Sequence, residues 1–139
     1  MTVTLSPYLN FRGTAREAIE FYHSVFGGDL TVSSFADFGM EVAEAEKHLV
    51  MHSQLSGGGL TLMASDVPSH MEYVVGTNTF SVCLSGDDEP TLTDYWHKLS
   101  AGATVDQPLS RSPWGDSFGR LHDRFGVSWL INIAATAAA

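Results

Sequence analysis

Two histidines four residues apart, His48 and His52, have a type and spacing that could bind a metal ion. On a helix this spacing places both imidazoles on one face, as in the HExxH zinc proteases. Here no glutamate follows the first histidine, and the surrounding residues predict a strand. Four residues of strand span about 13 Å, which is too far for both rings to reach one ion. We therefore expect His52 to be either a hydrogen-bonded structural histidine or a ligand contact.

Other reactive side chains lack the neighbours that their chemistry requires. Asp66 follows a strand in the sequence MASD, so it either caps the turn after the strand or acts as a general base. Ser110, Ser112 and Ser117 have no nucleophile-elbow pattern around them. Cys83 stands in an apolar strand without a cationic neighbour, which predicts a buried thiol of low reactivity.

A cation, an indole and a glycine occur close together in the segment Arg111-Ser112-Pro113-Trp114-Gly115-Asp116. Arg111 or Arg120 could bind a carboxylate or phosphonate, because a guanidinium donates two parallel hydrogen bonds to such groups. The alternative is an ordinary surface arginine with Trp114 packed beneath it.

The composition is typical of one soluble globular domain of 139 residues, with 44% apolar and 17% charged residues. Sixteen acidic and seven basic residues give a formal net charge of −9, which repels phosphate backbones and anionic membrane surfaces. We therefore expect neither nucleic acid nor a membrane as a partner. The amino terminus lacks a basic start and a long apolar run, and the single cysteine cannot form an intrachain disulfide, so we expect a cytoplasmic protein.

The apolar residues of 15–26 recur at helical spacing, with Thr14 and Glu17 as a predicted capping box and Gly27-Gly28 as the end of the helix. A second helix begins near Asp87 to Pro90 and ends before Gly102. The remaining apolar segments predict strands at 5–11, 30–35, 49–55, 60–64, 79–84, 104–109, 118–122 and 127–133.

This order of elements predicts an internal repeat. With an offset of 74 residues, Tyr22 aligns with Trp96 and His23 with His97, and strand, helix and three strands occur twice. We expect one α+β domain of two modules, 5–65 and 79–133, joined by a linker at 66–78 and followed by a flexible tail at 134–139.

Three stretches resemble the PhnB-like branch of the vicinal oxygen chelate superfamily: PYLNFRGTAREAIEFYHSVFGG at 7–28, VMHSQLSGGGLTLMASD at 50–66 and WGDSFGRLHDRFGVSWLINI at 114–133. This superfamily also contains glyoxalase I, extradiol dioxygenases and bleomycin-resistance proteins. The resemblance implies the glyoxalase/bleomycin-resistance-like α+β fold, with two βαβββ modules paired around a cleft, and a homodimer.

Some relatives in this branch carry a 3-demethylubiquinone methyltransferase label. The sequence does not predict that chemistry, because no strand is followed by a GxGxxG turn and a helix, and two modules fill the chain. The run Gly57-Gly58-Gly59 lies between two short strands, where it predicts a hairpin turn.

Metal-dependent members of the superfamily take His, Gln or Glu ligands from the first and last strands of each module. The matching strands predicted here contain no His, Asp or Glu, and Leu130 stands where the resemblance places the final-strand carboxylate of the glyoxalases. Asn10 and Asn132 are weak neutral donors. We therefore expect no catalytic metal and no cofactor.

These observations predict a protein that binds a small organic molecule in an aromatic-lined cleft. One alternative is a metal-dependent glyoxalase-like lyase or isomerase, or a dioxygenase-like enzyme, with an ion on His52 and Asn10 and with Asp66 as base. Another is an interaction module whose dimer surface matters more than its cleft. The predicted ligand-binding residues are Tyr8, Asn10, His52, Ser81, Trp114, Arg120 and Trp129.

Overall fold

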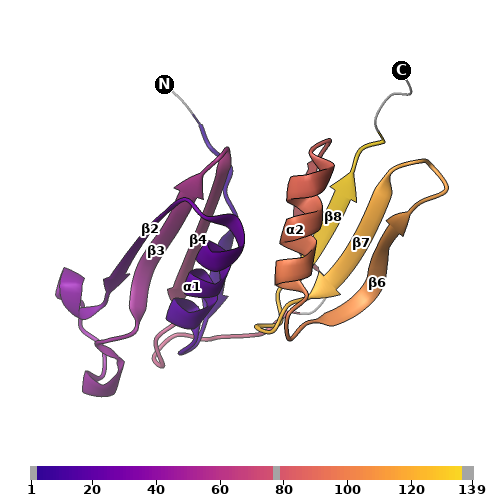
Figure 1. The fold of residues 1–139 in the computed structure, drawn as a ribbon. Helices are drawn as coiled ribbons and strands as arrows, with labels where there is room; N and C mark the ends of the chain where they lie inside the picture. The colour runs from indigo at the N-terminus through magenta and orange to yellow at the C-terminus, as the bar shows by residue number, and fades with distance from the viewer. Residues whose placement is uncertain (1–2, 77–78, 136–139) are drawn as a thin grey trace. The chain divides into compact units, whose positions relative to one another are not determined.

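The computed structural model of the chain describes residues 3–76 and 79–135. The chain separates into two compact units, Met1–Val74 and Val75–Ala139, each with one four-stranded sheet and one long helix (Figure 1). Both units follow the order strand, helix and three strands, so the predicted repeat and the α+β class are confirmed.

The first unit contains β1 (Tyr8–Phe11), α1 (Ala15–Phe26), β2 (Asp29–Ser34), β3 (Val50–Gly57) and β4 (Leu60–Asp66), with short 3-10 helices at Ala36–Phe38 and Glu44–Glu46. Its strands lie in the order β1-β4-β3-β2, and β1 runs parallel to β4 while the other pairs are antiparallel. The strand that opens the unit therefore pairs with the strand that ends it.

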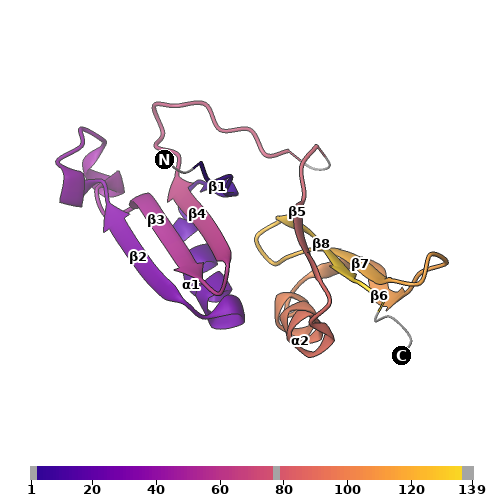
Figure 2. The same cartoon turned by 90° about the horizontal axis from the view of Figure 1, so that it is seen from above.

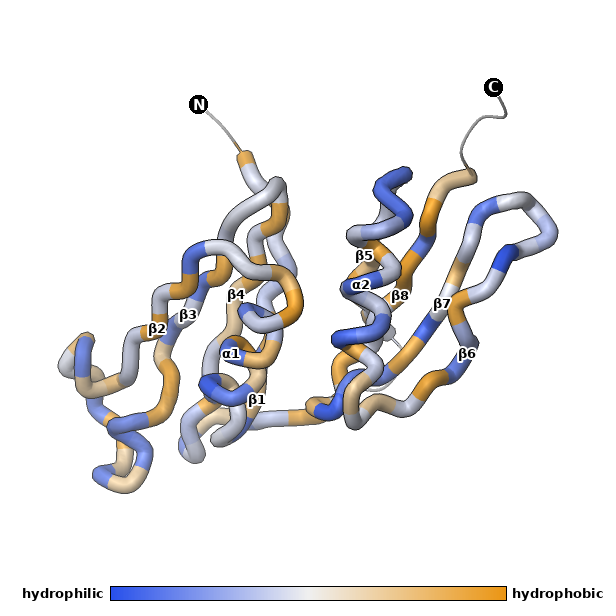
Figure 3. Tube along the Cα trace, viewed as in Figure 1, coloured by the Kyte–Doolittle hydropathy of each residue, from blue (hydrophilic) through white to orange (hydrophobic). Residues whose placement is uncertain are grey.

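The second unit repeats this topology with β5 (Val82–Gly86), α2 (Glu89–Leu99), β6 (Thr104–Arg111), β7 (Ser117–His122) and β8 (Ser128–Ile133). Its strand order is β5-β8-β7-β6, and β5 is parallel to β8. Both hydrophobic and hydrophilic residues occur along β6 and β7 (Figure 3). In β7, buried Gly119 and Leu121 alternate with the less buried Phe118, Arg120 and His122, as expected when one face of a sheet is covered and the other is not.

In each unit the helix covers one face of its own sheet (Figure 2). The helix α1 buries Ile19, Tyr22 and Val25, and the sheet residues Leu55 and Leu62 are buried as well. In the second unit the aligned helix residues Trp96 and Leu99 are buried, together with Leu121, Trp129 and Ile131 of the sheet. The repeated helix face seen in the sequence is therefore a repeated core.

The predicted capping box at the start of α1 is wrong. In the described part of the chain, the Thr14 side chain makes no capping hydrogen bond. The Asp66 carboxylate, at the end of β4, instead accepts hydrogen bonds from the backbone N–H groups of Gly13 (2.7 Å) and Ala15 (3.0 Å). The helix start is therefore satisfied from a distant strand and not from its own first turn.

The start of α2 is capped by a residue next to it in the sequence, as expected. Asp88 is the N-cap, and its carboxylate accepts hydrogen bonds from the backbone N–H of Thr91 at 3.1 Å and from the Thr91 hydroxyl at 2.9 Å. Pro90 stands in the first turn, where a missing N–H costs nothing.

Several predicted bounds differ from the structure. The strand β1 begins at Tyr8 and not at residue 5, and β5 begins at Val82 and not at residue 79. The first residues of the predicted tail are tied down, because Ala134 N–H donates to the Gly86 carbonyl and Ala135 N–H donates to the Asp116 carboxylate. Residues 136–139 of that tail lie outside the described residues. None of the described helices is long and apolar enough to cross a membrane.

Candidate ligand-binding faces

In the first unit, one face of the sheet is left uncovered by α1. Successive strand residues point to opposite faces, so Gln54 and Met63, which pair across β3 and β4, lie on the face opposite to buried Leu55 and Leu62. We call the surface formed by Tyr8, Asn10, His52, Gln54, Thr61 and Met63 the first open face.

Two rings from non-adjacent strands meet on the first open face. The Tyr8 hydroxyl lies 3.5 Å from His52 Nδ1, and the two ring centroids are 6.0 Å apart at an interplanar angle of 35°. Tyr8 is in β1 and His52 is in β3, with β4 between them in the sheet. A 3.5 Å contact is a weak hydrogen bond, so both groups can turn toward a ligand at little cost.

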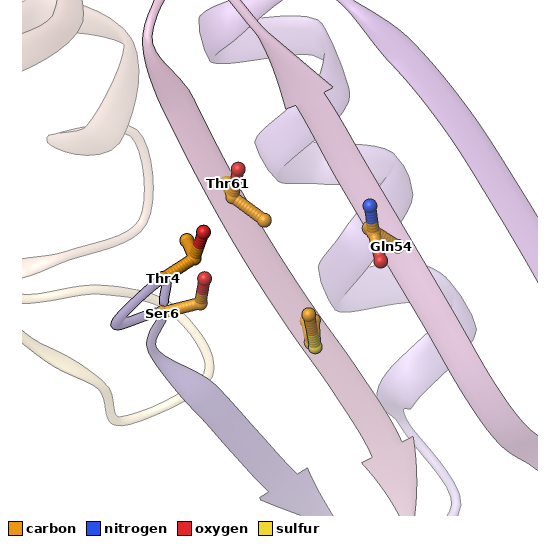
Figure 4. A pocket seen from close by; sticks show the side chains of 5 residues that line it. Thr4, Ser6, Gln54 and Thr61 are labelled. Atoms are coloured by element: carbon orange, nitrogen blue, oxygen red, sulfur yellow. The ribbon is translucent and has the colours of Figure 1, made fainter. Parts of the chain in front are cut away.

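A hollow of about 450 Å³ lies on the same face. It is lined by Thr4 and Ser6 from the segment before β1, by Gln54 of β3, and by Thr61 and Met63 of β4 (Figure 4). All five residues are uncharged, and hydroxyl, amide and thioether groups provide hydrogen bonds and apolar contact. Met63 also pairs with Tyr8 in the sheet, which places the hollow beside the Tyr8–His52 contact.

Arg12 organises the segment next to Asn10, a role that the sequence did not indicate. Its guanidinium donates hydrogen bonds to the carbonyls of Val67 and Pro68, both at 3.2 Å, and to the carbonyl of Met71. It also lies 5.2 Å from the centroid of the Tyr73 ring, and the Tyr73 hydroxyl donates to the Asn10 carbonyl at 3.4 Å. The Arg12 side chain therefore fixes the segment 67–73, which borders the first open face beside Asn10.

Asp66 cannot act as a base on the first open face. Asp66 is 3% exposed, and besides the two hydrogen bonds at the start of α1 its carboxylate accepts a hydrogen bond from the Val50 N–H at 2.9 Å. Asp66 pairs with Phe11, whereas the preceding residue Ser65 pairs with Asn10, so Asp66 and Asn10 point to opposite faces. The prediction of a capping aspartate is right in kind, but Asp66 caps α1 and not the turn that follows it.

The second open face is the side of the other sheet that α2 leaves uncovered. Along β7, Phe118, Arg120 and His122 alternate with buried Gly119 and Leu121, so all three project from this face. His122 Nδ1 lies 2.6 Å from Asp106 Oδ2 of β6. Ser81, which precedes β5, shares a 2.7 Å hydrogen bond with Ser128 of β8, and Ser128 pairs with His122.

Trp114 borders the second open face and is 64% exposed. Its ring meets Phe118 edge-on, with the centroids 6.2 Å apart. Arg111 pairs with Ser117 while the neighbouring Ser110 pairs with Phe118, so Arg111 points to the face opposite to Phe118. Of the two candidate arginines, only Arg120 therefore shares a face with Phe118.

Trp129 lies on the covered side of the same sheet. It is 1% exposed, and its indole N–H donates to the Asp123 carboxylate at 2.8 Å. Trp129 is therefore a core residue of its unit and not, as predicted from the sequence, a residue of the ligand-binding wall. The other six residues, Tyr8, Asn10, His52, Ser81, Trp114 and Arg120, stay predicted ligand contacts.

Cys83 is exposed, so the prediction of a buried thiol is wrong. It pairs with Leu130, which lies on the open side of β8 because its neighbours Trp129 and Ile131 are buried on the other. Partial desolvation raises the pKa of the Cys83 thiol, which keeps it protonated and unreactive near neutral pH.

Asp116 orients Asn132 on the second open face. The Asn132 side-chain amide donates to Asp116 Oδ2 at 3.0 Å, and the Ala135 backbone N–H donates to Oδ1 at 2.9 Å. These two hydrogen bonds, in that order, lower the pKa of Asp116 below its ordinary value of 3.8. Asp116 is therefore ionised at neutral pH and its oxygens are occupied.

The donor set does not fit the divalent metal of the superfamily's enzymes. Within residues 3–76 and 79–135, no group of three or more His, Cys, Asp or Glu side chains is arranged to hold an ion. His52 is neighboured by a phenol and not by carboxylates, and Leu130 offers no lone pair at all.

The two units have the architecture of the glyoxalase and bleomycin resistance proteins. Solved structures of that class and of fosfomycin resistance proteins, at 10–16% identity, share this fold, with TM-scores of 0.57–0.64. The sequence model of the family described as 3-demethylubiquinone-9 3-methyltransferase matches residues 3–132. The chain therefore belongs to this family, to which its motifs were predicted to relate it through PhnB-like proteins.

Three relatives are similar over nearly their whole length. Protein PA1353 from Pseudomonas aeruginosa is 35% identical, with 97% of this chain and 100% of that chain covered and a TM-score of 0.86. The PhnB protein from Bacillus cereus is 26% identical over 95% of this chain and 100% of its own, with a TM-score of 0.74. Protein YjdN of Escherichia coli is 26% identical over 93% of this chain and 94% of its own.

Proposed function

We propose that this protein is a cytoplasmic homodimer that binds a small organic molecule through the open faces of its sheets and uses no catalytic metal. The observation that carries the proposal is the first open face, where a hollow of about 450 Å³ lies beside the Tyr8–His52 contact. Concave sites with a few polar groups on a rigid sheet are typical of small-molecule binding.

The chemistry of this face supports binding more than catalysis. Tyr8, His52 and Gln54 offer hydrogen-bond donors and acceptors, and Met63 offers an adaptable apolar surface. Catalysis by the superfamily's route needs a metal or a positioned base. Among the described residues, no three His, Cys, Asp or Glu side chains are arranged to hold a metal ion. The candidate base, the Asp66 carboxylate, is buried on the other side of the sheet.

The family description names a methyltransferase, and our proposal departs from that name. Cofactors that contain adenosine, of which dinucleotides are the best-defined case, are commonly bound at a glycine-rich turn between a strand and a helix. The glycine run of this chain, Gly57 to Gly59, instead ends β3 and turns into β4. The matched region from residue 3 to residue 132 is occupied by the two repeated units.

A thermal-shift screen of small organic compounds tests the proposal, with Tyr8→Phe and His52→Ala as variants. We expect compounds that raise the melting temperature of the wild type and lose most of that shift in His52→Ala. His48→Ala is the matched control, because it removes an exposed imidazole that lies four residues before His52 in the sequence and is not part of the first open face. If no compound shifts the melting temperature, or if both histidine variants respond as the wild type does, the proposal is wrong.

Turnover assays separate binding from the enzymatic alternative. We expect neither an α-ketoaldehyde thiol adduct nor a catechol to be consumed. If one is consumed and His52→Ala abolishes turnover while the far-UV circular dichroism is unchanged, the protein is an enzyme of the glyoxalase or dioxygenase type. Size-exclusion chromatography with multi-angle light scattering tests the proposed homodimer. The expected molar mass is twice the 15.0 kDa of one chain.

A further inference from the structure

Arg120 on the second open face carries a charge that the described chain does not neutralise. Its neighbours across the sheet are Gln107 and Leu130, both uncharged. The ion pairs formed within residues 3–76 and 79–135 join Lys47 to Glu44, Lys98 to Asp94 and His122 to Asp106, so Arg120 is in none of them. Arg120 is exposed, and its position on an uncovered sheet face leaves its guanidinium accessible.

Asp106 and Asp116, two acids at this face, have other partners. Asp106 pairs with His122 at 2.6 Å, and Asp116 accepts hydrogen bonds from Asn132 and from the backbone of Ala135. Their carboxylates are thus held in place by groups other than Arg120. The guanidinium keeps its planar set of donors available to an anion from outside the chain.

An aromatic surface adjoins this cation. Phe118 stands two residues before Arg120 on the same face of β7, which separates their backbone positions by about 6.6 Å. Trp114 meets Phe118 edge-on at 6.2 Å and is largely exposed, so the pair extends the aromatic surface outward. A flat ring against Phe118 and Trp114 would place a carboxylate attached to it within reach of Arg120.

We propose that the ligand bound at the second open face is an aromatic carboxylate, with its ring on Phe118 and Trp114 and its carboxylate on Arg120. This inference rests on the proposed small-molecule function and names the class of ligand. A guanidinium distinguishes a carboxylate from the corresponding amide by charge, and the aromatic pair distinguishes a flat ring from a saturated one.

Calorimetric titration of the full chain with 2-naphthoate and with 2-naphthamide tests the inference, because the two probes share a ring system and differ in charge. We expect 2-naphthoate to bind at least about tenfold more tightly than the amide, because hydrogen bonds between two charged groups are stronger than hydrogen bonds to a neutral group. Cyclohexanecarboxylate, which keeps the charge without the aromatic ring, is expected to bind more weakly than 2-naphthoate.

Two arginine variants of the same hairpin locate the carboxylate. Arg120→Gln is expected to weaken 2-naphthoate binding about 10- to 100-fold and to leave 2-naphthamide binding nearly unchanged. Arg111→Gln removes the same charge from the opposite face of the sheet and is expected to change neither. Arg120→Lys, which keeps the charge but loses the paired donors, is expected to retain part of the affinity.

The outcomes separate this inference from the functional proposal. If 2-naphthoate and 2-naphthamide bind equally, or if Arg120→Gln and Arg111→Gln weaken 2-naphthoate binding alike, the inference is wrong. Compounds that still bind with dependence on His52 would then leave the functional proposal standing. If neither the naphthyl probes nor any screened compound binds the folded wild type, both are wrong.

Discussion

Asp66 accepts a hydrogen bond at 3.0 Å from the backbone N–H of Ala15, which lies 51 residues earlier in the chain. The same buried carboxylate holds the N–H groups of Gly13 and Val50. One side chain at the end of β4 therefore joins the start of α1 to the start of β3. The covered side of the first unit depends on this contact, and the first open face is the reverse side of the same strands.

Removing this carboxylate should destabilise the protein far more than removing the apparent cap. Asp66→Ala leaves three backbone N–H groups without an acceptor, for an expected loss of about 3 kcal/mol of unfolding free energy. Thr14→Ala should cost less than about 0.5 kcal/mol, because the exposed Thr14 side chain makes no capping bond in the described chain. Urea unfolding followed by far-UV circular dichroism measures both, and equal losses would contradict the assignment of the cap to Asp66.

Gly119 is needed where α2 meets its sheet. A Cβ at this position would lie 2.8 Å from two atoms of the Trp96 ring and 3.0 Å from the Leu109 Cα. Gly119→Ala should therefore lower the free energy of unfolding by about 2 kcal/mol. Gly76→Ala is the control, since its Cβ would meet nothing within 4 Å. A Gly119→Ala variant as stable as Gly76→Ala in urea unfolding would show that α2 packs differently.

The ionisation of Asp116 should make the free energy of unfolding depend on pH. Its pKa is lowered in the folded state, so the ionised carboxylate stabilises the fold fully above about pH 5 and loses this effect as the pH falls through the lowered pKa, below 3.8. The difference in urea midpoint between the wild type and Asp116→Asn should be largest at neutral pH and shrink as the pH falls below 3.8. A difference that is constant across this range would rule out a contribution from ionisation.

Arg12 should control the mobility of the segment that follows β4. Arg12→Gln removes the fork that binds the carbonyls of Val67, Pro68 and Met71, so the backbone amides of residues 67–73 should exchange with deuterium faster. Arg16→Gln, at an exposed position of α1, should leave this exchange unchanged. Mass spectrometry of the peptide that covers 67–73 measures both, and equal rates in the two variants would contradict the role of Arg12.

The order of elements could be predicted from the sequence because helix periodicity, caps and glycines are local signals. The Asp88 cap, three residues from Thr91, follows from local sequence. The Asp66 cap does not, because its partners are brought to it by the pairing of β1 with β4. The same pairing order puts Tyr8 near His52, and nothing in the spacing of these two residues predicts it.

The assignment of Trp129 to the ligand-binding wall could have been corrected from the sequence alone. Trp129 and Leu130 are consecutive in a strand, so they point to opposite faces, and only one of them can lie on the open side. The exposure of Cys83 has another cause. Its apolar neighbours predict burial, but Cys83 pairs with Leu130 on the side of the sheet that α2 leaves uncovered, whereas the next residue, Leu84, is buried on the other side.

We propose that organic ligands bind to this protein without a metal. The most direct test titrates the same ligand into two samples of one protein preparation. A compound that stabilises the wild type in the thermal-shift screen is titrated into protein as purified and into protein treated with a chelator, with the metal content of both measured. The account predicts equal affinities and far less than one metal ion per chain. Binding that is lost on chelation and restored by stoichiometric nickel, zinc or iron would contradict it.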